Sequence, residues 1–192
     1  MPTGGKHAIP KVAAVLRQIG VPVKAVFDMD FLSEKDLVKD TVNAFGGSWD
    51  VIEPLWMRID AAVRAGKKPM SIPEIKIEVI RLLNESKADE LPKGNIIEAL
   101  KQGKPWISVK NFGSSGMPNG EAQRDFRALQ EKLEDAGIYM VPVGEIENFC
   151  REVGSHGPKF VTKLLSSIAL SDSRLDALRT FVKRVHLGRH SC

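Results

Sequence analysis

Two pairs of acidic residues, far apart in the sequence, each follow a short apolar segment. Asp28 and Asp30 come directly after the apolar end of VKAVF, in the stretch VKAVFDMDFL. Glu145 and Glu147 follow IYMVPV, in the stretch VPVGEIENF. Carboxylates resist burial unless they are paired or bound to a cation, so their position at the ends of two core segments needs a reason. Oxygen ligands in this number suit Mg²⁺ or Mn²⁺, and no cluster of histidines and cysteines competes for the role.

The two apolar segments predict the elements that would bring these acids together. VPVKAVF (21–27) and IYMVPV (138–143) have the composition of short strands. Period-two alternation turns Met29 toward the core and both aspartates to the other side. In open parallel sheets, ligand sites lie outside the carboxyl ends of the strands. The four carboxylates therefore meet if the two strands are parallel neighbours, whereas an isolated Asp-x-Asp motif is more commonly a helix cap.

Helical periodicity surrounds both predicted strands. Helices are expected over residues 8–19, 121–137, 155–170 and 173–187. The stretch from about 33 to 104 is almost wholly helical in pattern, with little strand signal. We therefore predict an α/β fold with a small, mainly parallel sheet flanked by helices. The whole chain, 1–192, is expected to form one domain with a helical insertion at about 33–104.

Two local assignments follow from capping and turn signals. Ser33 in SEKDL is the expected N-cap of the next helix, with Asp36 at the last position of a near capping box. PWISVKNFG (105–113) is expected to form a short strand or an irregular bridge. GSSGMPNG, which completes the most loop-like stretch, could cradle a phosphate with its backbone N–H groups, although a flexible connector is the commoner role.

The bulk composition is that of an ordinary soluble globular protein, with 43% hydrophobic and 27% charged residues. No apolar run reaches the roughly 18 residues that a membrane span requires. The two cysteines do not make a disulfide framework, so we expect a cytoplasmic protein. The formal net charge of +4 permits contact with nucleic acid, but aromatic residues make up only 6% and do not interleave with the scattered basic ones. A base-stacking platform is therefore not indicated.

Three stretches of the sequence carry a family resemblance. GGKHAIPKVAAVLRQIGVPVKAVFDMDFL, VPVGEIENFC and LRTFVKRV together resemble the topoisomerase-primase (TOPRIM) domain, in the form found in OLD-family (overcoming lysogenization defect) ATP-dependent nucleases. The resemblance implies that Asp28 and Asp30 coordinate a divalent metal ion. It implies that an acidic residue after the later strand completes the site, which places this role on Glu147, with Glu145 as the competing choice.

The resemblance also implies a function, namely metal-dependent hydrolysis of phosphodiester bonds in DNA with Mg²⁺ or Mn²⁺ as cofactor. A cation would help to hold the scissile phosphate, and family members use a lysine late in the domain for this. Lys159 in SHGPKFV matches that position, and Lys6 lies at a turn expected to face phosphate. Both lysines could equally be ordinary surface residues near helix starts.

The sequence leaves partners and activity open in two respects. It contains no G-x-x-x-x-G-K-[ST] motif, so an ATPase would lie on another segment or another chain, and a homodimer is a further expectation. The family's first strand, which ends in Glu-Gly, has no counterpart in MPTGGKH; either it lies outside this chain or a glycine turn replaces it. The alternative function is a non-catalytic TOPRIM-like module that docks an ATPase partner, and nucleotidyl transfer or RNA processing is a third.

Overall fold

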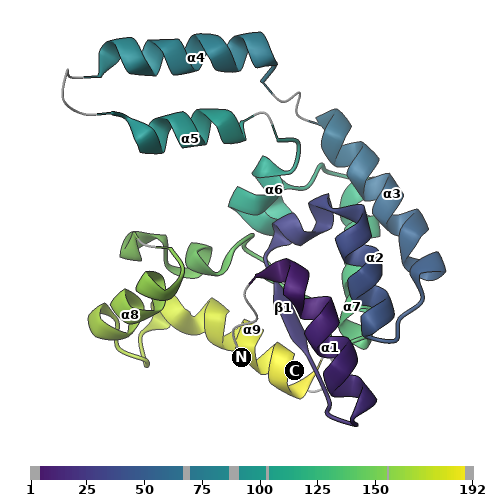
Figure 1. Cartoon of the computed structure of the whole chain (residues 1–192). Helices are drawn as coiled ribbons and strands as arrows, with labels where there is room; N and C mark the ends of the chain where they lie inside the picture. Colours follow the sequence, from purple (N-terminus) through teal and green to yellow (C-terminus); the bar gives the residue numbers. More distant parts are fainter. Residues whose placement is uncertain (1–4, 67–69, 87–90, 103, 155, 189–192) are drawn as a thin grey trace.

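The computed structural model describes residues 5–66, 70–86, 91–102, 104–154 and 156–188, and most of these residues are helical (Figure 1). The α-helices are α1 (Ile9–Gln18), α2 (Lys35–Ala44), α3 (Trp49–Gly66), α4 (Ile72–Glu85), α5 (Lys93–Lys101), α6 (Ile107–Phe112), α7 (Glu121–Asp135), α8 (Pro158–Ser167) and α9 (Asp176–Leu187). Short 3₁₀ helices precede α1 or lie between later elements: η1 (Lys6–Ala8), η2 (Met29–Ser33), η3 (Gly113–Gly116), η4 (Ile146–Val153) and η5 (Ser173–Leu175).

The described residues form one two-stranded sheet, whose strands β1 (Ala25–Phe27) and β2 (Ile138–Met140) run parallel. The predicted parallel pairing of these two segments is therefore confirmed, although both strands are shorter than the sequence indicated. The last bond of the ladder runs from the N–H of Val141 to the carbonyl of Phe27, at 2.9 Å. The next ladder bond would join the N–H of Met29 to the carbonyl of Val141, but that N–H donates to Gly144 at 2.7 Å and that carbonyl accepts the N–H of Gly144 at 3.0 Å, so the regular pairing ends there.

The main core lies on one face of the sheet, where α2, α3 and α7 pack against it. Phe27 and Phe31 stack with their ring centroids 4.1 Å apart. The indole N–H of Trp56 donates to the carbonyl of Leu32 at 2.9 Å, which fastens α3 to η2. The residue between the two aspartates, Met29, is fully buried in this core, as alternation predicted. The apolar face of the α2–α3 segment is thus part of the same core as the strands.

The other face of the sheet is covered by α9. Tyr139 and Val141 point away from the main core and pack with Phe181 of α9 in a separate apolar cluster. The ammonium of Lys24 donates to the carbonyl of Val185 at 2.7 Å, which fastens the chain before β1 to the same helix. All three residues of β2 are buried because both faces of this strand are covered, whereas Val26 of β1 is 39% exposed on the α9 side.

Helices α4 and α5 form an antiparallel hairpin that projects from the rest of the molecule (Figure 1, top). A capping box between Ser71 and Glu74 begins α4. No described residue of α4 is buried, and Ile72 is 83% exposed. The described part of 33–104 is helical, as predicted. Its assignment as one insertion stays a prediction, since α2 and α3 share the main core while α4 and α5 extend outward.

Two local predictions are wrong. Ser33 does not cap α2: it is the last residue of η2, its hydroxyl donates to the carbonyl of Asp30 at 2.6 Å, and Glu34 takes the N-cap position. The segment 105–113 contains α6 rather than a strand, because Trp106 and Val109 bury one helical face in the core. Among the described residues, no helix has the length and apolar character needed to cross a membrane.

Candidate metal centre

A backbone contact at Gly144 joins the two acidic segments. The N–H of Met29 donates to the carbonyl of Gly144 at 2.7 Å, so the turn after β1 is bonded to the turn after β2. Gly144 has φ 102°, and a Cβ at this position would stand 1.9 Å from the carbonyl oxygen of Lys110. Only glycine fits such a backbone and such a close approach. The contact places Asp28 and Asp30 beside Glu145.

Asp28 lies at the centre of the acidic group. The pKa of its carboxyl is raised from the ordinary value of 3.8 to about 6, chiefly by burial and then by the charges of Asp30, Glu147 and Glu145, in that order. The charge of Lys110 acts in the opposite direction. The charges of the other three carboxylates thus act on Asp28, while the meeting of all four around one cation stays a prediction. Strongly perturbed acids in such clusters are typical of functional sites, while the binding of metal by these residues stays a prediction.

The principal cation among the carboxylates is Lys110 of α6, which the sequence did not indicate. Its ammonium lies 3.6 Å from Oδ2 of Asp30 and 3.5 Å from Oε2 of Glu145, so it bridges the two acidic segments. Partial burial lowers the pKa of Lys110, but the charges of Asp30, Glu145 and Asp28 outweigh burial and raise it. The amide of Asn148 donates to the carbonyl of Val143 at 2.9 Å and also reaches two carbonyls of α6, which holds the helix in place.

Lys6, the second lysine predicted from the sequence, reaches the site from η1. Its ammonium lies 3.4 Å from Oδ2 of Asp30 and 2.7 Å from Oε1 of Glu34. Two lysines, Lys6 and Lys110, therefore lie near the same oxygen of Asp30. The N-terminal residues from Gly5 to Ala8 form a turn and η1, so the described chain has no strand before α1.

Lys159, the first lysine predicted, is not brought to the carboxylates by any contact. It is exposed near the start of α8 and makes no ion pair with another residue of the described ranges. The connection at this side of the site is through Glu147, whose Oε1 accepts the N–H of Gly157 at 2.8 Å. His156 Nδ1 lies 3.9 Å from the same oxygen. Glu147 thus fixes the turn that precedes α8, with its second oxygen left for another partner.

The four side chains offer carboxylate oxygens, which are the ligands that a hard divalent cation prefers. The raised pKa of Asp28 shows that its negative charge is destabilised where it stands. Within the ranges that the structure describes, however, no three acidic, histidine or cysteine side chains are arranged as a ready-made ligand set. Lys110 and Lys6 lie against the oxygens of Asp30, Glu145 and Glu34 instead. A divalent cation would have to displace these lysines from the carboxylates.

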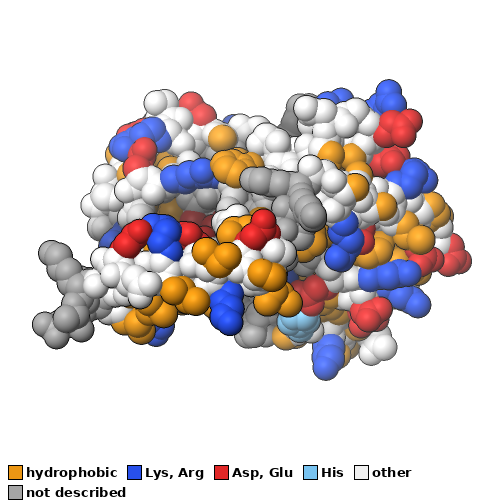
Figure 2. Space-filling view, turned by 90° about the horizontal axis from the view of Figure 1, so that it is seen from above, with side chains coloured by type: hydrophobic (Ala, Val, Ile, Leu, Met, Phe, Trp, Pro, Cys, Tyr) orange, Lys and Arg blue, Asp and Glu red, His pale blue; other side chains and the backbone are white. Residues whose placement is uncertain are grey.

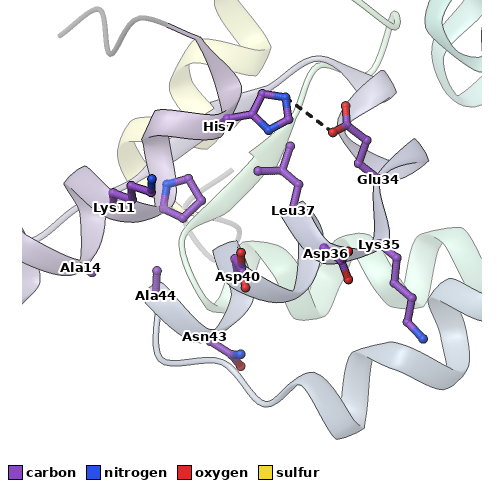
Figure 3. Close-up of a pocket in the computed structure, with 11 residues that line it drawn as sticks. His7, Lys11, Ala14, Glu34, Lys35, Asp36, Leu37, Asp40, Asn43 and Ala44 are labelled. Carbon is purple, nitrogen blue, oxygen red and sulfur yellow. Dashed lines mark ion pairs between the residues drawn. The ribbon is translucent and has the colours of Figure 1, made fainter.

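A pocket of about 750 Å³ lies between α1 and α2, away from the four carboxylates. Figure 3 shows His7 and Lys11 on one side and Asp36 and Asp40 on the other. Glu34 is shared between this pocket and the metal centre, since it pairs with both Lys6 and His7. The pocket has charges of both signs and contains none of the four predicted ligands, so we place the candidate chemistry at the carboxylates.

Comparison with known protein families, with curated proteins and with solved structures finds no match to this chain. The assignment of a function therefore depends on the geometry of the site and on the sequence motifs.

Proposed function

We propose that the chain is a divalent-metal-dependent module that hydrolyses phosphodiester bonds in DNA, of the TOPRIM type found in OLD-family nucleases. The observation that carries the proposal is the parallel pairing of β1 and β2. It brings the acidic turns after both strands together around Asp28, whose pKa is raised to about 6 by burial and by its three acidic neighbours. A cluster of like charges is costly unless a cation is bound to it.

The residues take distinct roles under this proposal. Asp28, Asp30 and Glu147 would hold Mg²⁺ or Mn²⁺, with Glu145 as the competing ligand. Such an ion supplies an activated water and stabilises the leaving oxygen of the phosphodiester. Lys110, which contacts the carboxylates in the metal-free chain, becomes available to a phosphate oxygen once a metal ion neutralises them.

Two further lysines complete the proposal. Lys6 stands in the same relation to Asp30 as Lys110 and would act in the same way. Lys159 would serve only if substrate reached the start of α8, because no contact in the described structure ties it to the carboxylates. ATP hydrolysis, where it is coupled to cleavage, would be supplied by another segment or chain, since the sequence has no phosphate-binding loop of the Walker type.

The test is nicking of supercoiled plasmid by the full chain with Mn²⁺ or Mg²⁺. We expect nicking by the unmodified protein and its loss in Asp28→Ala and Asp30→Ala. Asp40→Ala, on the exposed side of α2, is the matched control and should nick normally. Nicking that survives both substitutions at the metal centre would refute the proposal.

One alternative is supported by specific observations, namely a non-catalytic module that docks an ATPase partner. Lys110 and Lys6 already neutralise part of the acidic cluster, and α4 exposes Ile72, Ile77 and Leu83 to solvent. Figure 2 shows hydrophobic side chains exposed on the face that carries the hairpin. Calorimetry with Mn²⁺ separates the two functions, because a docking module should show no metal binding that depends on Asp28.

A further inference from the structure

A pocket of about 380 Å³ adjoins the metal centre, and four of its ten lining residues are basic. They are Lys6, Arg64, Lys104 and Lys110. Two of the acidic residues already described, Asp30 and Glu34, form the boundary with the metal centre. The pocket thus runs from the candidate catalytic carboxylates to the C-terminal end of α3 and the segment before α6, and it has a net positive charge.

Arg64, the basic residue farthest along α3, is exposed and is paired with Asp60, which is partly buried. Nε of Arg64 donates to Oδ2 of Asp60 at 2.7 Å. The other oxygen of Asp60 accepts the indole N–H of Trp106 at 2.8 Å. Asp60 therefore fixes the Arg64 guanidinium at the pocket and ties α3 to the start of α6. The terminal nitrogens of Arg64 are left for another acceptor.

The remaining lining shows what kind of ligand the pocket suits. Lys104 is exposed and makes no ion pair with another described residue. Trp106 is only 4% exposed and its N–H is already bonded, so it offers no face on which a base could stack. Charge without an aromatic platform is the pattern of proteins that contact the phosphates of a nucleic acid rather than its bases.

We propose that this pocket binds the phosphate chain of a single nucleic-acid strand on one side of the phosphodiester held at the metal centre. The inference rests on the proposed function, and it states where the DNA strand runs as it leaves the metal centre. Lys6 and Lys110 are shared between pocket and metal centre, whereas Arg64 and Lys104 contact the neighbouring phosphates. The volume lies at the lower end of the range for ligand pockets, which fits one strand and not a duplex. Binding here is independent of base sequence.

The test measures binding of a short fluorescein-labelled single-stranded oligodeoxynucleotide to the full chain by fluorescence anisotropy, over a salt series with chelator present. The variants are Arg64→Gln, which keeps a donor for Asp60, and Lys104→Ala. The control is Lys132→Ala, which removes the same charge from the end of α7 that leads into the amino end of β2. Each pocket variant should lower the slope of log K against log salt by about 0.7 and weaken binding about three- to fivefold at moderate salt.

The outcomes separate the pocket from the proposed function. Losses in both pocket variants, with Lys132→Ala unchanged and with oligonucleotides of different sequence bound equally, support the pocket. Equal affinity in Lys104→Ala, Arg64→Gln and Lys132→Ala refutes it, as does a marked preference for one base sequence. Because binding is measured without metal, these results are independent of plasmid nicking, and nicking that survives Asp28→Ala would refute the hydrolytic function alone.

Discussion

Replacing Asp28 by asparagine should stabilise the metal-free protein, although Asp28 is the residue on which the proposed activity most depends. The pKa of Asp28 rises from 3.8 to about 6, chiefly through burial and then through the charges of Asp30, Glu147 and Glu145. Each pKa unit corresponds to about 1.4 kcal/mol, so the ionised carboxylate costs the folded state up to about 3 kcal/mol. Since Asp28 is only partly buried, solvent screening reduces this to about 1–2 kcal/mol.

The sign of the pH dependence follows from the direction of the pKa shift. A carboxyl with a raised pKa binds its proton more tightly in the folded state than in the unfolded state. The wild-type protein therefore loses stability as the pH rises from the unfolded-state pKa of 3.8 through the folded-state pKa of about 6. Asparagine does not titrate, so its advantage should be absent below this range and complete above it.

Urea denaturation with chelator present, at about pH 4 and about pH 8, measures this difference as a change in the free energy of unfolding. Added Mn²⁺ should reverse the order at the higher pH, because it stabilises wild type but not Asp28→Asn. Asp40→Asn, exposed on α2, is the control and should match wild type. The reasoning fails if Asp28→Asn is less stable than wild type at about pH 8 or if the difference does not change with pH.

Three other substitutions probe two contacts of the site and one ion pair between α9 and α7. Gly144→Ala should lower the free energy of unfolding by about 2–4 kcal/mol, measured by thermal unfolding, and abolish nicking, because its Cβ would clash with the carbonyl of Lys110. The control is Gly94→Ala in α5, where a Cβ meets nothing within 4 Å; it should raise the free energy of unfolding by about 0.5–1 kcal/mol. Lys110→Gln should strengthen Mn²⁺ binding in calorimetry, because a competing cation is gone, yet lower nicking about 100-fold; weaker Mn²⁺ binding would contradict this. Arg184→Ala should cost about 2–4 kcal/mol in urea denaturation, because it leaves Glu134, whose side chain is 2% exposed, without the guanidinium 2.9 Å away; adding Glu134→Gln should recover most of this loss.

The strand ends and their acids could be predicted because their signals are local. Short apolar runs followed by Asp28 or Glu145 are visible in the sequence, and the parallel pairing follows from the helical segments that separate the runs. The lengths of the strands could not be predicted in the same way. They depend on which partner each backbone group finds after the last ladder bond, and here the N–H of Met29 and the carbonyl of Val141 both bond to Gly144 instead of to each other.

Lys110 and the short helix that carries it were missed because tertiary packing decided the outcome. PWISVKNFG contains β-branched and aromatic residues that favour a strand. The helix forms because Trp106 and Val109 both enter the main core at a spacing of three. Gly113, directly after the helix, has φ 61° and packs against the carbonyl of Pro142. The local signal for a helix that ends here was Gly113, which follows the apolar pair Trp106 and Val109 at a spacing of three residues.

The two lysines explain how an acidic cluster can exist in a chain that folds before it meets a metal ion. Four carboxylates near the ends of β1 and β2 would repel one another, and this repulsion adds to burial in raising the pKa of Asp28. Lys110 and Lys6 offset part of that repulsion through Asp30 and Glu145. The affinity for a divalent cation is then a difference between two sets of ion pairs. A bound cation would replace the lysines as the partner of the carboxylates. The displaced ammonium groups would then stay beside the metal centre, where they could pair with the negative charge of a phosphate.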